Sequence, residues 1–253
     1  MLYVARTPEK VGKGVMKMKK GVCLSMVFLL LLGWMVLPSP GPAGEPRAPR
    51  MVIIDPAHGG NDKGVKLSDQ EYEKDLTLKI ALELQKELQA SENIRVRLTR
   101  SSDSEMAKAE RNKAVREARA DICISLHVNA GFGKTAAGYE VYFPGFNAPQ
   151  GKTDGAAEIL KDMTKNKYLN DSVALAQSIM TNLGKAFARK GRGLRDAPVP
   201  LLDGLSLPAV VVELGFGTNP EDKKTLTNAE GRRAIVQALS RGIREYFKKA
   251  KPV

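Results

Sequence analysis

The chain is poor in cysteine and histidine, which limits the disulfides and the histidine-based sites that it can form. Its 253 residues include two cysteines, Cys23 and Cys123, and two histidines, His58 and His127. We expect Cys23 to be removed with an N-terminal signal, so Cys123 would stand alone and no internal disulfide could form. Cys123 lies in an apolar run, which favours a small buried thiol. The domain must therefore be held by its core, with a bound metal ion as a further means of stabilisation.

The sequence also lacks the basic patterns that are typical of nucleic-acid binding. The formal net charge is +12, yet there is no arginine-rich run and no basic stripe interleaved with aromatic residues. This surplus of positive charge is compatible with an ordinary solvated surface, and it would attract an anionic cell envelope as well as a nucleic acid. We therefore expect no nucleic-acid partner.

Residues 1–43 have the pattern of a secretory signal. Three lysines at positions 17–20 precede an apolar stretch over 22–37, and small residues follow before a cleavage point at Gly44. An uncleaved anchor is the alternative, because about 16 apolar residues lie near the lower limit for spanning a bilayer. The lysines direct the rest of the chain outward in either case. We expect an exported protein of the periplasm, cell envelope or extracellular space, touching the membrane only through this segment.

A proline-rich linker over 44–50 leads into one domain over 51–250. Within the domain, strand-like and helix-like patterns alternate, which predicts an α/β fold with a twisted, largely parallel or mixed six-stranded sheet and helices on both faces. The expected strands are 52–55, 94–100, 121–127, 138–143, 199–202 and 208–216. The expected helices are 73–88, 102–119, 156–168, 172–189, one opening at Pro220 after an Asn219 cap, and one closing the domain to about 247.

Capping boxes define two of these helix starts. The pattern Ser-x-x-Glu over 102–105 predicts the start of a polar helix that runs to about 119. The pattern Thr-x-x-Glu over 227–230 predicts the cap of the closing helix.

Three side chains suited to chemistry stand at or near the ends of predicted strands. They are His58, His127 and Glu213, and sites in open α/β sheets gather at the carboxyl ends of strands. Two histidines with carboxylates form the ligand set of a catalytic zinc site, which keeps one position open. The helical His-Glu-x-x-His signature is absent, so distant positions must supply the ligands. Glu73 and Glu71, both close to the His58 loop, are the candidates for a third ligand.

Glu213 is unusual because it follows three valines in the most apolar strand. A carboxylate there costs on the order of several kcal/mol to keep charged unless it is paired or used. A salt bridge to a buried arginine is the structural alternative. The residues by themselves thus predict a metal hydrolase without naming its substrate.

Four separated motifs add a family resemblance. They are Asp-Pro-Ala-His-Gly-Gly-x-Asp-x-Gly at 55–64, Glu-Lys at 73–74, Ser-Leu-His-Val-Asn-Ala at 125–130 and Val-Glu-Leu-Gly-Phe-x-x-Asn-Pro at 212–220. Together they resemble the zinc-dependent N-acetylmuramoyl-L-alanine amidases of bacterial cell walls. The resemblance implies that His58, Glu73 and His127 hold one Zn²⁺ and that Glu213 is the catalytic acid and base. It also selects Glu73 over Glu71.

The same resemblance implies the substrate. Members hydrolyse the amide between the lactyl group of N-acetylmuramic acid and L-alanine of the peptidoglycan stem peptide, in cell-wall turnover or daughter-cell separation. Ala57 replaces the family's usual glycine, which costs little if the backbone at that position does not need a positive φ. We expect a monomer.

A regulatory hypothesis concerns residues 144–171. Some family members carry an inhibitory helix in this region, which covers the zinc until an activator protein withdraws it. Here Glu158 and Asp162 are the candidate plugs, and a plain surface loop is the alternative.

Two other functions compete with the amidase hypothesis. One is a wall-binding domain without catalysis, and the presence of all four expected residues argues against it. The other is a zinc exopeptidase on a similar sheet, a class that often uses two metals and more acidic or histidine ligands than these motifs supply.

Overall fold

The computed structural model describes residues 48–144, 156–187, 191–197, 201 and 205–250, with side chains of helix α4 described from Lys167 onward. The expected signal or anchor over 1–43 and most of the linker lie outside these residues. Among the described helices, none is both long enough and apolar enough to cross a membrane.

Six strands form one mixed sheet in the order β2-β1-β3-β6-β4-β5, in which only the β4–β6 pair is antiparallel. The strands are β1 (Arg50–Pro56), β2 (Ile94–Leu98), β3 (Ile122–Asn129), β4 (Glu140–Pro144), β5 (Leu194–Ala197) and β6 (Ala209–Phe216). The helices are α2 (Glu73–Gln89), α3 (Lys108–Glu117), α4 (Ala156–Leu183), α5 (Pro220–Thr227) and α6 (Ala229–Lys249). The six-stranded mixed α/β fold expected from the sequence is confirmed.

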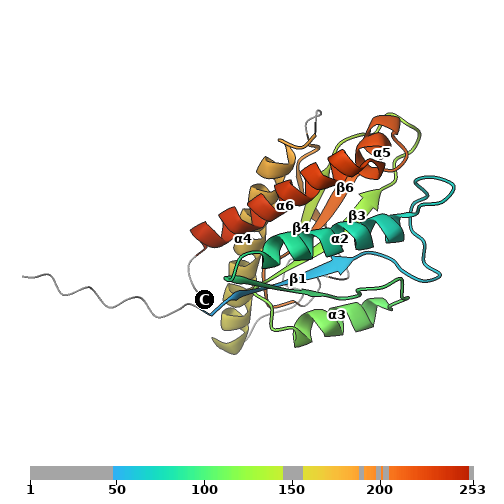
Figure 1. Cartoon of the computed structure of the whole chain (residues 1–253). Coiled ribbons are helices and arrows are strands. Elements are labelled where there is room, and N and C mark those ends of the chain that lie inside the picture. The colour runs from blue at the N-terminus through green and yellow to red at the C-terminus, as the bar shows by residue number, and fades with distance from the viewer. Residues whose placement is uncertain (1–47, 145–155, 188–190, 198–200, 202–204, 251–253) are drawn as a thin grey trace, which may run out of the picture. The chain divides into compact units, whose positions relative to one another are not determined.

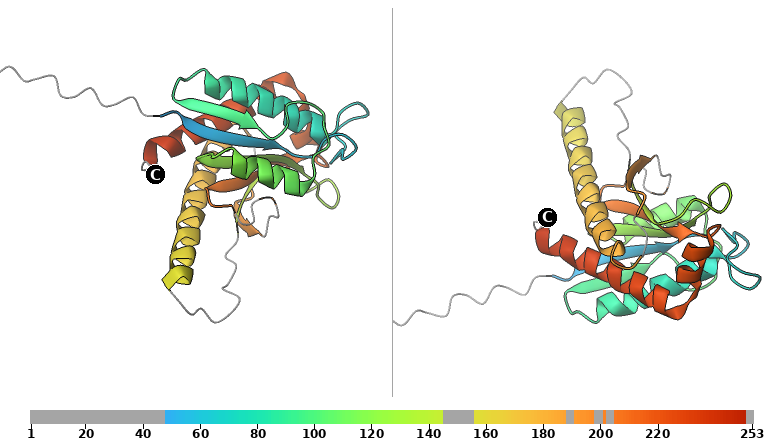
Figure 2. Two further views of the ribbon diagram at one scale, coloured as in Figure 1. Left: turned by 90° about the horizontal axis from the view of Figure 1, so that it is seen from below. Right: turned by 90° about the horizontal axis from the view of Figure 1, so that it is seen from above.

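The two faces of the sheet are covered unequally (Figures 1 and 2). Alternate residues of a strand point to opposite faces, so Val52 and Ile54 face one way and Ile53 the other. The first face packs against the apolar stripes of α2, α4 and α6 in the larger core. The second face packs against α3 through Val115, in a smaller core that includes Cys123. As expected, the Cys123 thiol is free and fully buried.

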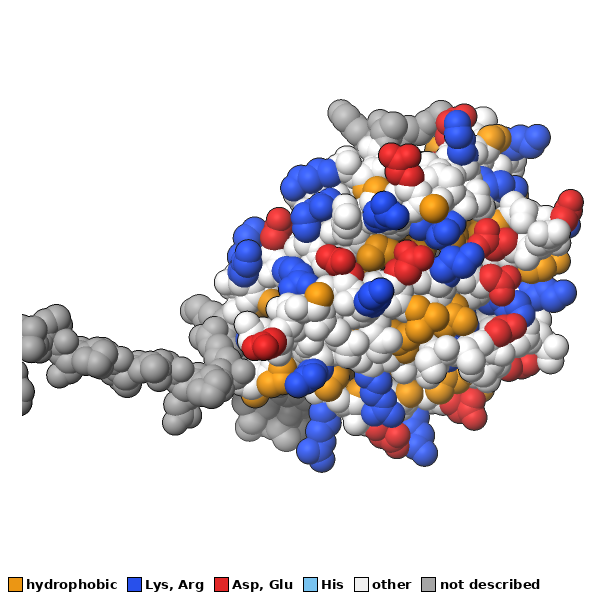
Figure 3. Space-filling view, in the orientation of Figure 1, with side chains coloured by type: hydrophobic (Ala, Val, Ile, Leu, Met, Phe, Trp, Pro, Cys, Tyr) orange, Lys and Arg blue, Asp and Glu red, His pale blue; other side chains and the backbone are white. Residues whose placement is uncertain are grey.

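The exposed surface over α2 and α6 carries Lys, Arg, Asp and Glu side chains intermixed (Figure 3). This face shows no large area of a single charge, which fits the solvated surface expected from the composition.

The helix α3 starts later than the sequence predicted. Its N-cap is Ala107, whose backbone N–H donates to the Glu110 carboxylate at 2.9 Å, and Ser102 lies in the preceding loop. That loop is fixed instead by Asp103, which accepts hydrogen bonds from Gly60 N at 2.7 Å and Lys74 Nζ at 2.6 Å. Contacts with the His58 loop therefore outweigh the local capping pattern.

The two C-terminal helices meet at Asn228. Asn219 caps α5 as predicted, with Pro220 at the first helical position. The closing helix, however, is capped by Asn228, whose side chain accepts from Gly231 N at 2.6 Å. The prediction of Thr227 as this cap was wrong, because Thr227 still belongs to α5 and its hydroxyl donates to Lys223 O.

The structure also bears on the predictions between 156 and 202. The helices expected over 156–168 and 172–189 are one helix, α4, which ends at Leu183. The N-terminal half of α4 extends away from the sheet (Figure 2), and Glu158 and Asp162 lie in its first part, where side chains are not described. The fifth strand in chain order is β5, and of the strand expected over 199–202 only Leu201 is described and lies in a turn, while 199, 200 and 202 lie outside the described residues.

Candidate metal centre

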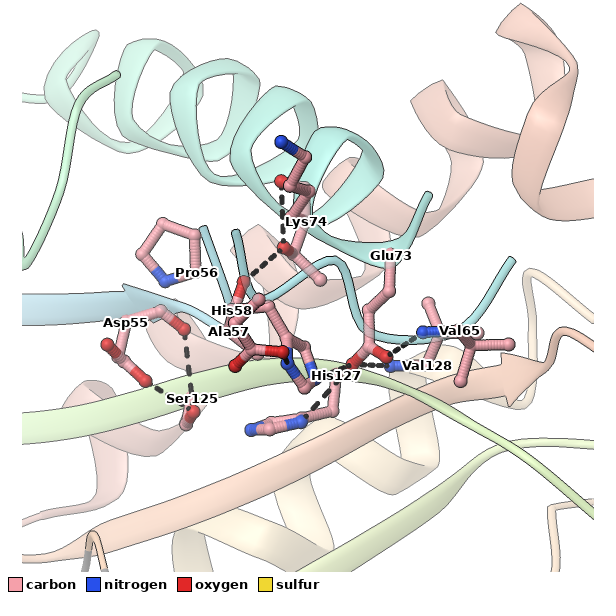
Figure 4. Close-up of polar contacts among 12 residues, drawn as sticks. Asp55, Pro56, Ala57, His58, Val65, Glu73, Lys74, Ser125, His127 and Val128 are labelled. Atoms are coloured by element: carbon pink, nitrogen blue, oxygen red, sulfur yellow. Dashed lines mark hydrogen bonds and ion pairs between the residues drawn. The ribbon is translucent and has the colours of Figure 1, made fainter. Parts of the chain in front are cut away.

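Three predicted ligands come together at one end of the sheet (Figure 4). His58 lies in the loop after β1, Glu73 is the first residue of α2, and His127 lies on β3. Glu73 Oε1 is 3.1 Å from His58 Nε2 and 3.3 Å from His127 Nδ1. One donor atom from each residue falls within 4.8 Å of the others. Glu71 is not part of this cluster, and its carboxylate pairs with Lys79.

The backbone around His58 is held by two buried arginines. His58 itself takes a left-handed conformation, with φ of 60°. Arg100 donates to the carbonyl oxygens of Pro56 at 3.0 Å and Ala57 at 2.8 Å, while Arg111 donates to those of Pro56 and His58. Ala57 is not among the described residues with positive φ. The extra methyl group at that position therefore costs little, as the sequence predicted.

Glu73 is buried, with 2% of its surface exposed, and all its contacts favour the ionised form. Val128 N–H donates to Oε1 at 2.9 Å and Val65 N–H donates to Oε2 at 3.0 Å. Burial opposes ionisation, but hydrogen bonds from the two histidines and these backbone groups outweigh it and lower the pKa of Glu73 to about 2. Gly64 makes this packing possible, because a Cβ there would lie 2.6 Å from Glu73 Oε2.

The orientation of the His58 ring is set by Asp62. His58 Nδ1 lies 2.8 Å from Asp62 Oδ1, so this nitrogen is the natural donor and Nε2 is left to face Glu73. Such an outer carboxylate fixes the tautomer of a metal-binding histidine. The hydrogen bond with Glu73, followed by that with Asp62, raises the pKa of His58 despite partial burial.

The donor set and its spacing fit a zinc ion. Tetrahedral zinc with bonds of about 2.0–2.1 Å requires ligand atoms about 3.3 Å apart. The two separations that involve Glu73 Oε1 are 3.1 and 3.3 Å. Two imidazole nitrogens and one carboxylate oxygen are also the donors that zinc prefers, and three protein ligands leave one position open. These residues could therefore hold a single catalytic metal.

Glu213 lies beside this cluster on the next strand. The sheet register pairs Glu213 on β6 with His127 on β3, so both side chains leave the same face. Glu213 Oε2 is buried without a hydrogen-bond partner, and no described arginine forms a salt bridge with this carboxylate. The structural alternative of a buried arginine pair is thus not met among the described residues. Burial, reinforced by the charges of Glu73 and Glu140, raises the pKa of Glu213 to about 7 although the nearby histidines oppose the shift.

Sequence reasoning missed Glu140, which faces Glu213 across the β4–β6 pair. It is buried and accepts hydrogen bonds from Asn129 and Tyr142 and a 2.6 Å salt bridge from Arg192. The alternation of the segment Gly138–Phe143 puts Glu140 and Tyr142 on one face, but only the pairing of β4 with β6 shows which face that is.

A cavity lies at the opposite end of the strands from these residues. This cavity of about 750 Å³ is formed near the amino ends of β1 and β3 and between α4 and α6. Its lining includes Arg50, Asp121, Tyr168 and Tyr246 but none of the clustered ligands. The candidate metal ligands lie instead at the carboxyl ends of the strands, where open α/β sheets place their sites.

Comparison with known proteins agrees with this geometry. A family model described as N-acetylmuramoyl-L-alanine amidase (Amidase_3) matches residues 52–245. The chain is 26% identical over 235 residues to the N-acetylmuramoyl-L-alanine amidase AmiC of Escherichia coli O6:H1, covering 83% of this chain and 55% of AmiC. It is 30% identical over 207 residues to the probable cell wall amidase LytH of Staphylococcus epidermidis, covering 81% of this chain and 61% of LytH.

A solved structure shows the same fold. The crystal structure of an N-acetylmuramoyl-L-alanine amidase from Clostridium difficile 630 superposes with a TM-score of 0.67 and 28% identity, covering 81% of this chain and all of that one. The chain spans little more than half the length of AmiC and LytH. The family model nevertheless covers most of its residues, and the chain belongs to the Amidase_3 family of N-acetylmuramoyl-L-alanine amidases.

Proposed function

We propose that this chain is a zinc-dependent hydrolase that cleaves the amide between N-acetylmuramic acid and L-alanine in peptidoglycan. The observation that carries the proposal is the convergence of His58 Nε2, Glu73 Oε1 and His127 Nδ1 beside Glu213. Family membership supplies the substrate class. The donor spacing supports one zinc ion, and the structure brings no second set of ligands together among the described residues.

Zinc in such a site acts as a Lewis acid toward an amide carbonyl and makes water a better nucleophile at neutral pH. The side chains of the protein would bind the metal and transfer the proton. His58, Glu73 and His127 would fix the metal at the carboxyl end of the sheet, and Glu73 neutralises part of its charge.

Glu213 would move the proton. Its carboxylate would take a proton from the attacking water and give it to the departing amine of L-alanine. Burial raises its pKa to about 7 in the metal-free site, and a carboxyl group that accepts and then returns a proton is what general base and acid catalysis requires. The orphaned Oε2 supports this role, since a buried carboxylate oxygen without a partner is costly unless it is used.

The location follows from the substrate. Peptidoglycan lies outside the cytoplasmic membrane, which supports export by the signal or anchor over residues 1–43. We assign catalysis to the domain over 51–250 and place its action in the periplasm, cell envelope or extracellular space.

The test is an analysis of fragments released from purified peptidoglycan. Mass spectrometry should find free stem peptides that begin with L-alanine, and removal of zinc by a chelator should stop their release until zinc is restored. Fragments cut elsewhere in the stem peptide, or release that is unaffected by metal removal, would contradict the proposal.

A further inference from the structure

The described part of the chain contains a second polar cluster beside the metal centre, built on the buried Glu140. Arg192 Nε lies 2.6 Å and Arg195 Nε 3.3 Å from Glu140 Oε1. The other carboxylate oxygen accepts hydrogen bonds from Asn129 Nδ2 at 2.9 Å and the Tyr142 hydroxyl at 2.8 Å. Both oxygens of Glu140 are thus fully engaged.

This cluster lies on the same face of the sheet as the metal centre. The register places His127, Glu213 and Glu140 in one row across β3, β6 and β4, and it places Arg195 opposite Tyr142. Residues directly opposite each other point to the same side. The Arg192 guanidinium lies 5.3 Å from the centre of the Phe216 ring, near the end of β6. Both arginines therefore lie near Glu213 on this face of the sheet.

The two guanidinium groups carry more positive charge than their partner neutralises. Glu140 supplies one negative charge for the two positive charges that it contacts. Each arginine uses its Nε on Glu140, and among the described residues the terminal nitrogens of either form no hydrogen bond or ion pair, although the Arg192 guanidinium lies over the Phe216 ring. Their side chains are 41% and 44% exposed.

The buried arginines of the His58 loop behave differently. Arg100 and Arg111 both use terminal nitrogens to bind backbone carbonyls. Arg192 and Arg195 instead contact Glu140 through Nε, and their side chains are partly exposed to solvent. A guanidinium held in this way is ready to bind a carboxylate through two parallel hydrogen bonds.

We propose that Arg192 and Arg195 bind a free carboxylate of the stem peptide, downstream of the L-alanine that is released. This inference rests on the proposed amidase function and extends it to substrate recognition. Neighbouring strands lie about 4.8 Å apart, so Glu140 is about 10 Å across the sheet from His127. An extended peptide covers about 3.3 Å per residue, so the arginines meet the second or third residue of the stem.

The experiment compares two synthetic muramyl peptides. They have the same sequence and differ only in whether the carboxylates after L-alanine are free or converted to amides. Zinc-loaded full-length protein and the variants Arg192→Gln and Arg195→Gln are assayed with both. Arg233→Gln is the control, because Arg233 is an exposed arginine on α6, which packs against the other face of the sheet.

Wild-type protein should cleave the free-acid peptide with a kcat/KM about 10-fold or more above that of the amide, as expected for a charge-assisted contact. Each site variant should lose this preference, mainly through a raised KM for the acid. Cleavage of the amide should fall clearly less than cleavage of the acid, and circular dichroism with urea unfolding shows that each variant is folded. The control variant should keep the preference.

Equal losses on both peptides would show that the arginines act only through Glu140, and no loss on either would show that they do not touch the substrate. Both results overturn the inference. If Arg192→Gln fails to fold because Glu140 loses its shorter salt bridge, Arg195→Gln decides alone. Cleavage of both peptides by wild-type protein without preference refutes the carboxylate contact but leaves the amidase function intact, whereas cleavage of neither refutes the function itself.

Discussion

Replacing Glu213 by glutamine should stabilise the metal-free protein at neutral and alkaline pH. Glutamine has the shape of the protonated carboxyl group and carries no charge. The wild-type side chain is partly buried, and its Oε2 is buried with no hydrogen-bond partner among the described residues. Ionisation of Glu213 therefore destabilises the folded, metal-free wild-type protein, whereas glutamine cannot ionise.

The size of the effect follows from the pKa. Burial raises the pKa of Glu213 from an ordinary 4.5 to about 7 in the folded protein. A pKa raised on folding gives stability that is fully present below 4.5 and is lost as pH rises through 7. The difference corresponds to about 3 kcal/mol at 1.36 kcal/mol for each pH unit. Wild type and variant should be equally stable near pH 4, and above pH 8 the free energy of unfolding of the variant should be larger by about 3 kcal/mol.

The assay is urea unfolding in the presence of a chelator at several pH values between 4 and 8.5. Glu92→Gln is a matched control, because Glu92 is an exposed glutamate between α2 and β2 and its replacement should leave the difference near zero at every pH. Saturation with zinc should shrink the gain in Glu213→Gln, since a nearby cation favours the carboxylate. A constant difference between wild type and Glu213→Gln across this pH range would refute the claim that this carboxylate is buried and unpaired.

Three further predictions concern the metal centre and its loop. Glu73→Gln should weaken zinc binding by at least about 100-fold in a chelator competition, while Glu71→Gln leaves it unchanged, because Glu73 alone of the two reaches the histidines. Gly64→Ala should weaken zinc binding and lower the free energy of unfolding by about 1–3 kcal/mol, since φ is +64° and the new Cβ meets Glu73; unchanged urea and zinc titrations would count against this packing. Arg100→Met should lower the free energy of unfolding by about 3 kcal/mol, because buried carbonyls around His58 lose their donors, and a loss below 1 kcal/mol would contradict that reasoning.

The sequence predicted the parts of the site that depend on local pattern. His58 and His127 were identified because each stands at or just after the end of an apolar strand, among polar and small residues, and parallel strands bring such positions together. Glu213 was identified because an acid among valines is costly. The choice of Glu73 over Glu71 needed the family resemblance. The structure gives the physical reason: Glu73 lies at the start of α2, where its oxygens meet the N–H groups of Val65 and Val128.

The parts that the sequence did not predict depend on contacts between distant segments. Ser102 has the pattern of a cap, but Asp103 next to it is bound by Gly60 and Lys74, which keeps the segment in a loop. The strand β5 has little apolar alternation because it lies at the edge of the sheet beside β4. In the sequence Glu140 cannot be distinguished from any other acidic residue of a strand. Only the antiparallel pairing of β4 with β6 shows that it lies opposite Glu213.

The central claim is that Glu213 transfers the proton while His58, Glu73 and His127 hold the metal. The most direct measurement is made on Glu213→Gln, with zinc content determined on the same sample as the release of stem peptides beginning with L-alanine. We predict one zinc per chain and a loss of turnover of at least about 100-fold, the scale of a missing general acid and base. A variant that keeps its zinc and near-normal turnover would contradict the account.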